Sequence, residues 1–129
     1  MEAQELIKKI AKKQEVKTYL IHVFDAFQLM DYHKLNDVLY DDCFYEDMKK
    51  PSFIYRQKQI FQYFRKQGDS SLNLSTNICT GCLCSEPVFV LTGNTSGAKY
   101  GIYVKFVKDD IVDIFICSEQ SDYLGLMPF

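Results

Sequence analysis

Tryptophan is absent from this chain of 129 residues, and no apolar run approaches the ~18 residues needed to cross a bilayer. The chain also lacks a basic excess, because 15 Lys and Arg are balanced by 17 Asp and Glu. Non-specific nucleic-acid binding depends on such an excess, since it rests on neutralising phosphates. These absences argue against a membrane protein and a general nucleic-acid binder, so neither a membrane nor a nucleic acid is an expected partner.

The N-terminus lacks the basic-then-apolar order of a signal peptide, and the five cysteines are an odd number. A domain of this size does not need disulfides, so we expect reduced thiols and a cytoplasmic (cytosolic) location. Cys79, Cys82 and Cys84 resemble a metal motif, but strand alternation puts Cys79 on the face opposite the other two. The sequence therefore predicts no bound metal and no cofactor.

What the chain does contain is a helical first half and a strand-rich second half, which meet near Gly68. Apolar residues at helical spacing predict helices over residues 3–30, 31–40 and 53–67. Alternating apolar and polar residues predict strands over residues 72–84, 88–92, 100–107 and 111–118. Helices and strands segregated in this way are typical of an α+β fold, and the length fits a single domain spanning residues 1–129.

The segment 43–47 has the alternation of a short strand, with Cys43, Tyr45 and Asp47 on one face and Glu46 on the solvated one. A carboxylate in an apolar cavity has a raised pKa and can transfer protons near neutrality. Asp47 is therefore the candidate catalytic residue, as a general acid or base. The alternative is that Asp47 ends the strand and hydrogen-bonds a turn at Lys49–Ser52.

This order of elements resembles the nuclear transport factor 2-like superfamily, which includes the steroid Δ5-isomerases and the SnoaL-like cyclases. The likeness is most concrete over Asp31–Asp47, which is similar to the isomerase segment with an Asp-capped helix, an Asp-Asp turn and a final Glu-Asp. Gln59-Ile60 with Phe64 resembles the third isomerase helix, and Phe106–Ile111 resembles the turn before the last strand. The resemblance implies a cone-shaped, curved antiparallel sheet wrapped around the N-terminal helices, the cystatin-like arrangement.

The resemblance also implies which parts of the isomerase chemistry are missing. The isomerase general base falls on Asp47, but the two oxyanion donors fall on Val23 and Ile102, which cannot donate hydrogen bonds. The loss of one such donor costs a factor of roughly 10²–10³ in rate, so steroid isomerisation is not expected. Tyr19 lies one helical turn before Val23 and is a candidate to present its phenol to the same cavity.

We therefore expect the cone to bind a small apolar or aromatic ligand, in a homodimer formed through the outer sheet face near Tyr103 and Phe115. The expected ligand-binding residues are Tyr19, Val23, Phe27, Tyr45, Phe64, Ile102, Val104 and Ile114. One alternative is a cofactor-independent isomerase, lyase or hydrolase that uses Asp47. Another is a homodimeric interaction module whose cone is filled by its own side chains. The apolar tail Tyr123–Phe129 is expected to pack over the mouth of the cone or on a partner.

These hypotheses make different demands on the interior. A cavity larger than ~300 Å³ that contains Asp47 and a second polar group would favour a ligand binder or an enzyme. A cone filled by its own Phe and Tyr side chains would favour the interaction module.

Overall fold

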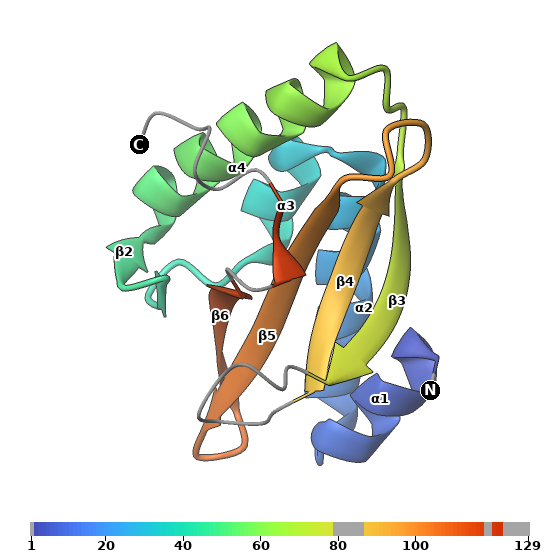
Figure 1. Ribbon diagram of the computed structural model, residues 1–129. Coiled ribbons are helices and arrows are strands. Elements are labelled where there is room, and N and C mark those ends of the chain that lie inside the picture. The colour runs from blue at the N-terminus through green and yellow to red at the C-terminus, as the bar shows by residue number, and fades with distance from the viewer. Residues whose placement is uncertain (1, 79–86, 118–119, 123–129) are drawn as a thin grey trace.

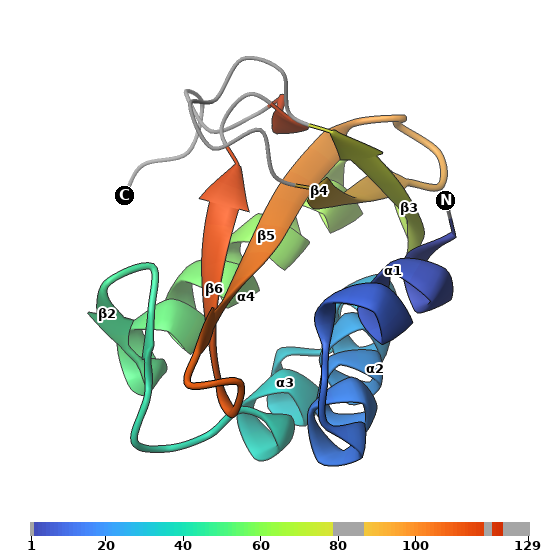
Figure 2. The same cartoon turned by 90° about the horizontal axis from the view of Figure 1, so that it is seen from below.

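The computed structural model describes residues 2–78, 87–117 and 120–122. Within these residues the chain forms helices on one face of a twisted antiparallel sheet (Figures 1 and 2). The helices are α1 (Ala3–Ile10), α2 (Gln14–Leu29), α3 (Tyr32–Val38) and α4 (Lys50–Lys66). The strands, in their order across the sheet, are β3 (Leu72–Ile78), β4 (Pro87–Gly93), β5 (Lys99–Val107) and β6 (Ile111–Cys117). The predicted α+β class is therefore confirmed.

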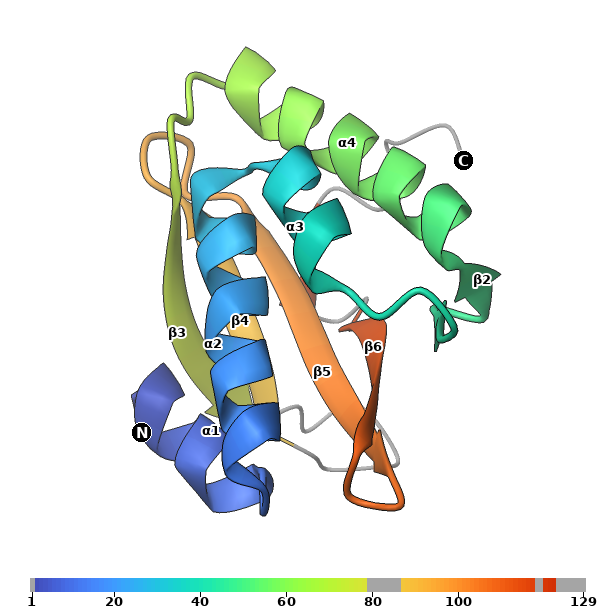
Figure 3. The ribbon, with the colours of Figure 1, turned by 180° about the vertical axis from the view of Figure 1, so that it is seen from behind.

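A small hairpin adjoins the sheet at its β6 edge. It consists of β1 (Phe44–Tyr45) and β2 (Met48–Lys49), paired in antiparallel register. The backbone N–H of Glu46 donates to the Ile114 carbonyl of β6 at 3.0 Å. Figure 3 shows this hairpin beside the start of α4, at the far side of the molecule from α1 and β3.

The first predicted helix is two helices, because the chain turns sharply at residues 11–13. Ala11 and Lys13 both have extended backbone angles. Lys12 lies 3.7 Å from Asp109, and Lys13 hydrogen-bonds Asp110, so both lysines reach the turn between β5 and β6. The break folds α1 back and buries two of its apolar side chains, Leu6 and Ile7.

The predicted turn at Lys49–Ser52 is wrong, because α4 already begins at Lys50. Pro51 lies in the first turn of this helix. Backbone N–H groups there have no partner within the helix, so the missing N–H of proline costs no hydrogen bond. The buried Lys50 ammonium donates to the Leu39 carbonyl at 2.8 Å and to the Asp41 carboxylate at 2.7 Å. These two bonds fix the start of α4 against the end of α3.

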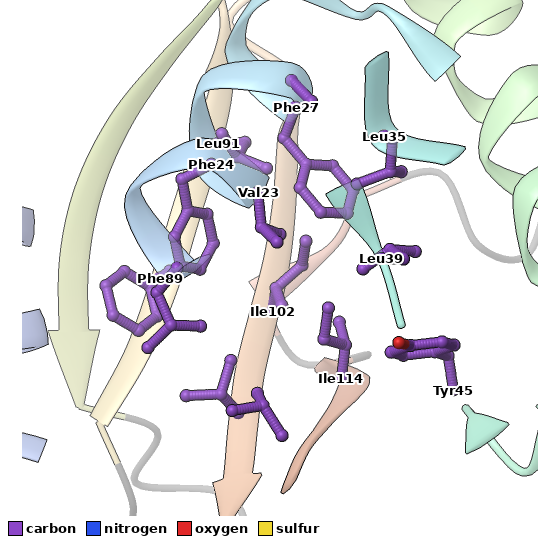
Figure 4. Close-up of a cluster of buried hydrophobic side chains, with 14 of the residues drawn as sticks. Val23, Phe24, Phe27, Leu35, Leu39, Tyr45, Phe89, Leu91, Ile102 and Ile114 are labelled. Carbon is purple, nitrogen blue, oxygen red and sulfur yellow. The ribbon is translucent and has the colours of Figure 1, made fainter. Parts of the chain in front are cut away.

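The core lies between the helices and the inner face of the sheet, and aromatic rings make up much of it. The ring centroids of Phe24 and Phe89 are 4.3 Å apart, and Phe27 packs edge-on against Phe61 and Tyr100 at 5.9 and 6.1 Å. Figure 4 shows side chains from α2, α3 and the strands gathered into this cluster. The predicted inward faces of β5 and β6 are confirmed, since the following side chains all belong to the core or pack against it: Tyr100, Ile102, Val104, Phe106, Val112, Ile114 and Ile116.

The Asp69 carboxylate joins the C-terminal end of α4 to the turn between β4 and β5. Asp69, which is 3% exposed, accepts hydrogen bonds from the backbone N–H groups of Thr95 and Ser96 and from the Ser96 hydroxyl, all at 2.7–2.8 Å. A Cβ at Gly93 would collide with the Asp69 carboxylate. Glycine at position 93 therefore makes room for this carboxylate.

Some predicted features lie outside the described residues. They are the end of the 72–84 strand with Cys79, Cys82 and Cys84, and the tail Tyr123–Phe129. Among the described residues, no helix is long and apolar enough to cross a membrane. In that same part of the chain, no group of three or more His, Cys, Asp or Glu side chains is placed to hold a metal ion.

Candidate functional site

The predicted position of Asp47 on an inward strand face is wrong. Glu46 and Asp47 have φ angles of 50° and 59°, and they form the two-residue turn between β1 and β2. The strand alternation therefore stops at Tyr45, and Asp47 points outward. It lines an open surface hollow of about 570 Å³ with Asp42, Cys43, Phe44 and Asp113. An exposed carboxylate lacks the desolvation on which the expected acid/base role depended.

Glu46, and not Asp47, is the partly buried acidic residue of this turn. Its side chain is half-buried, and its carboxylate accepts a hydrogen bond from the backbone N–H of Ile116 in β6. Burial raises the pKa of Glu46, although the Ile116 N–H and the charge of Arg56 act in the opposite direction. The prediction of a solvated Glu46 is therefore wrong, because the left-handed turn redirects its side chain toward the edge of the sheet.

The eight residues expected to contact a ligand are packed against one another in the main core. The two most exposed of them, Tyr19 and Val104, are each 7% exposed. All belong to one continuous apolar cluster: Tyr19, Val23, Phe27, Tyr45, Phe64, Ile102, Val104 and Ile114. None of them lines the open hollow around Asp47. Their role as ligand contacts stays a prediction.

Three tyrosines connect α2 to the hairpin. The Tyr45 hydroxyl donates to the Tyr40 carbonyl at 3.0 Å and lies 3.4 Å from the Tyr19 hydroxyl. The Tyr19 and Tyr40 rings stack at 4.3 Å. Burial raises the pKa of Tyr19 to about 12 and raises that of Tyr45 as well. These phenols stay protonated near neutral pH, so they act here as hydrogen-bonding groups between packed elements.

A buried polar pair joins α4 to β5. The Tyr100 hydroxyl donates to the Gln57 amide oxygen at 2.6 Å, and both side chains are 0% exposed. The Gln57 amide nitrogen is buried with no hydrogen-bond partner in the described structure. A buried N–H group left unpaired costs about 1–3 kcal/mol, so natural proteins rarely keep one without a structural or functional reason.

Two charged groups act electrostatically on the phenol of this pair. Glu46 and Arg56 are both half-buried, and their charges act in opposite directions on the Tyr100 phenol, whose pKa is raised mainly by burial. The four side chains form what we call the polar cluster: Glu46, Arg56, Gln57 and Tyr100. It supplies a buried amide donor, a neutral phenol and one charge of each sign.

The sequence contained a signal for Gln57 that our prediction did not use. Gln57 follows Phe53 by four residues and precedes Phe61 by four, so it lies on the apolar stripe of α4. A polar residue in the middle of such a stripe must be buried with it. The inward direction of Tyr100 was predicted, but its pairing with α4 depends on tertiary packing.

The chain matches no protein-family model, and comparisons with curated proteins and with solved structures find no significant match.

Proposed function

We propose that this chain is a non-catalytic binding domain for a small, largely apolar ligand, which the polar cluster recognises. The observation that supports the proposal is the fully buried Gln57 amide nitrogen, which lacks a hydrogen-bond partner in the described structure. Its surroundings are mainly aromatic and aliphatic, as in most small-molecule sites, where a few polar groups fix the ligand's orientation. The exposed Asp47 and the apolar residues Val23 and Ile102 leave little support for the enzyme alternative.

Membership of the nuclear transport factor 2-like superfamily is part of the same proposal. It is supported by the element order, in which helices, a short hairpin and another helix precede an antiparallel meander. The hairpin lies beside β6, where the Glu46 N–H donates to the Ile114 carbonyl, although it forms a separate two-stranded sheet. Folds of this kind place ligands between the helices and the sheet, which is also where Gln57 and Tyr100 meet.

Nuclear magnetic resonance provides the test of ligand binding. The Gln57 side-chain amide signals, assigned by their loss in Gln57→Met, should shift when a panel of small aromatic compounds is added. Gln62→Leu is the matched control, because Gln62 is exposed on the same helix. If no compound moves the Gln57 signals while the protein remains folded, the binding proposal is wrong.

A homodimeric interaction module is the second candidate, and the packed positions of the eight expected ligand contacts favour it. On the opposite face of the sheet, Tyr103 and Phe115 stack at 5.3 Å, and both are half-exposed. An aromatic pair in that position suits an isologous contact with a second copy. Light scattering should then give a dimer mass that Phe115→Lys reduces to a monomer mass.

A further inference from the structure

An open hollow lies between α4 and the connection from α2 to α3, two segments of the helical layer. Figure 3 shows α3 and α4 side by side. The hollow has a volume of about 400 Å³, within the range of roughly 300–1,000 Å³ that is typical of small-molecule sites. One wall comes from residues 29–33, and the other from one face of α4 that includes Lys58 and Arg65. None of the four polar-cluster side chains lines it, so it is separate from the site proposed above.

The lining of this hollow carries an excess of positive charge. Lys58 and Arg65 contribute two positive charges and Asp31 one negative charge, which leaves a net charge of +1 when His33 is neutral. The Asp31 carboxylate already accepts a hydrogen bond from the backbone N–H of Lys34, as the cap of α3. The chain as a whole has a net charge of −2, so a positive hollow stands against the average of the molecule.

Two other hollows of the described surface have the opposite charge. They have volumes of about 510 and 570 Å³, and neither has a lysine or arginine in its lining. Their acidic lining residues are Glu15, Asp41, Asp42, Asp47, Asp110 and Asp113. An anion would be repelled from both of these hollows and attracted to the one beside α4.

The two cations beside α4 are held in place without a carboxylate. The Lys58 ammonium lies 5.3 Å from the centroid of the Tyr32 ring. The Arg65 guanidinium donates to the carbonyls of Leu29 and Met30, at the end of α2, at 3.3 and 3.4 Å. Within residues 2–78, 87–117 and 120–122, neither cation forms a salt bridge. The carbonyl end of α2 partly offsets the charge of Arg65, so Lys58 is the less compensated of the two.

The same hollow offers apolar surface next to these charges. Leu29 is 55% exposed, and the Tyr32 ring stacks on the His33 ring with 4.3 Å between the centroids. An exposed leucine and an aromatic pair suit the apolar body of a ligand. A net charge of +1 is matched by one negative charge, whereas a dianion would leave one charge without a partner.

Going beyond the function proposed above, we propose that this hollow is a second binding site, which takes a small organic monoanion: a carboxylate on an apolar, ring-containing body. The carboxylate accepts a hydrogen bond from the Lys58 ammonium. The ring lies against Leu29 and Tyr32, and Arg65 adds to the positive potential from the other end of the α4 wall.

Four probes separate the parts of this proposal: 2-naphthoate, 2-naphthamide, acetate and 2-naphthyl phosphate. Nuclear magnetic resonance titrations follow the backbone amide signals of Tyr32, His33 and Gln62, which line the hollow. In the wild type, 2-naphthoate should shift these signals with an affinity about fivefold above that of its neutral amide, the upper end for a partly exposed ion pair. Acetate, which lacks the ring, should bind more weakly still.

A matched pair of variants tests the role of Lys58. Lys58→Met keeps an unbranched apolar side chain but removes the charge, so it should reduce the affinity for 2-naphthoate to that for 2-naphthamide. Lys66→Met removes the same charge from an exposed position of the same helix outside the hollow, and it should retain the preference. In the wild type, added salt should weaken the binding of 2-naphthoate and leave that of 2-naphthamide unchanged. This salt measurement tests the charge even if Lys58→Met does not fold.

Several results would overturn the proposal. Equal affinities for 2-naphthoate and 2-naphthamide would remove the role of charge, and equal affinities for 2-naphthoate and acetate would remove that of the ring. Tighter binding of 2-naphthyl phosphate would overturn the monoanion, and equal losses in the two lysine variants would indicate only long-range attraction. If 2-naphthoate shifted the Gln57 side-chain signals but not those of the hollow, the function proposed above would stand and this second site would not.

Discussion

Two turns of this fold are each anchored by a carboxylate, and the two differ in the number of donors that the carboxylate meets. Asp69 joins the end of α4 to the turn between β4 and β5, and it accepts three hydrogen bonds. Glu46 joins the β1–β2 turn to β6, and its carboxylate accepts one, from Ile116. Desolvation raises the pKa of both groups, but for Asp69 the bonds to Ser96 and Thr95 outweigh it and the pKa is lowered. For Glu46 desolvation prevails and the pKa is raised.

The comparison separates a structural region from a candidate binding region. Around Asp69 every carboxylate oxygen has a donor, so the carboxylate has its stabilising partners without any ligand. Around Glu46 the polar cluster includes a buried amide nitrogen that no protein group satisfies in the described structure. A partly satisfied buried network lowers stability, and such exceptions concentrate where a protein binds or reacts.

The largest effect is expected from Asp69→Ala. This change leaves the N–H groups of Thr95 and Ser96 without their acceptor, so the free energy of unfolding should fall by roughly 3 kcal/mol. For a domain of this size the melting temperature should drop by about 10 °C. Calorimetry or urea unfolding measures both quantities. Asp25→Ala on the exposed face of α2 is the control and should change little. An equally small effect of Asp69→Ala would mean that the three bonds do not hold the turn.

The Gln57–Tyr100 pair should show a smaller and non-additive effect. Tyr100→Phe removes the donor to the Gln57 oxygen and should cost about 1–2 kcal/mol, because the whole amide is then buried without a partner. Combining it with Gln57→Met removes both polar groups, so the double variant should be more stable than Tyr100→Phe alone. Urea unfolding of the single and double variants measures the coupling. Additive losses would indicate that the two side chains do not depend on each other.

The pH dependence of stability should have opposite signs for the two carboxylates. Asp69 has a folded pKa below its ordinary 3.8, so its contribution is present above that value and is lost as the pH falls toward the folded pKa. Glu46 has a folded pKa above its ordinary 4.5, so its contribution is complete below that value and is lost as the pH rises through the folded pKa. Urea unfolding between about pH 3 and pH 7 should therefore show a smaller acid-side loss in Asp69→Asn. In Glu46→Gln, the free energy of unfolding should fall less than in the wild type as the pH rises above about 4.5. If the two variants gave the same pH profile, the comparison between the two carboxylates would be contradicted.

The sequence predicted what depends on local periodicity. The alternation of apolar and polar residues predicted the inward faces of β5 and β6. Helical spacing predicted that Leu35 of α3 is buried. The turn at Glu46 and Asp47 could not be predicted in this way, because neither residue is the Gly or Asn that usually marks left-handed angles. At the break between α1 and α2, Lys12 and Lys13 contact Asp109 and Asp110, almost a hundred residues away in the chain, and local periodicity gives no sign of such contacts.

That unpredicted turn gives the smallest expected effect and a direct test of the original catalytic hypothesis. Asp47 holds a φ of 59°, an angle that glycine adopts more easily than any residue with a Cβ. Asp47→Gly should therefore raise the free energy of unfolding slightly, by roughly 0.5–1 kcal/mol. Because the Asp47 side chain is exposed and outside the polar cluster, the shift of the Gln57 amide signals on adding a bound aromatic compound should be unchanged. If Asp47→Gly kept its stability but lost ligand binding, Asp47 would be part of the binding site after all. If Glu46→Gln lost binding instead, the binding site would involve the half-buried Glu46 of the same turn.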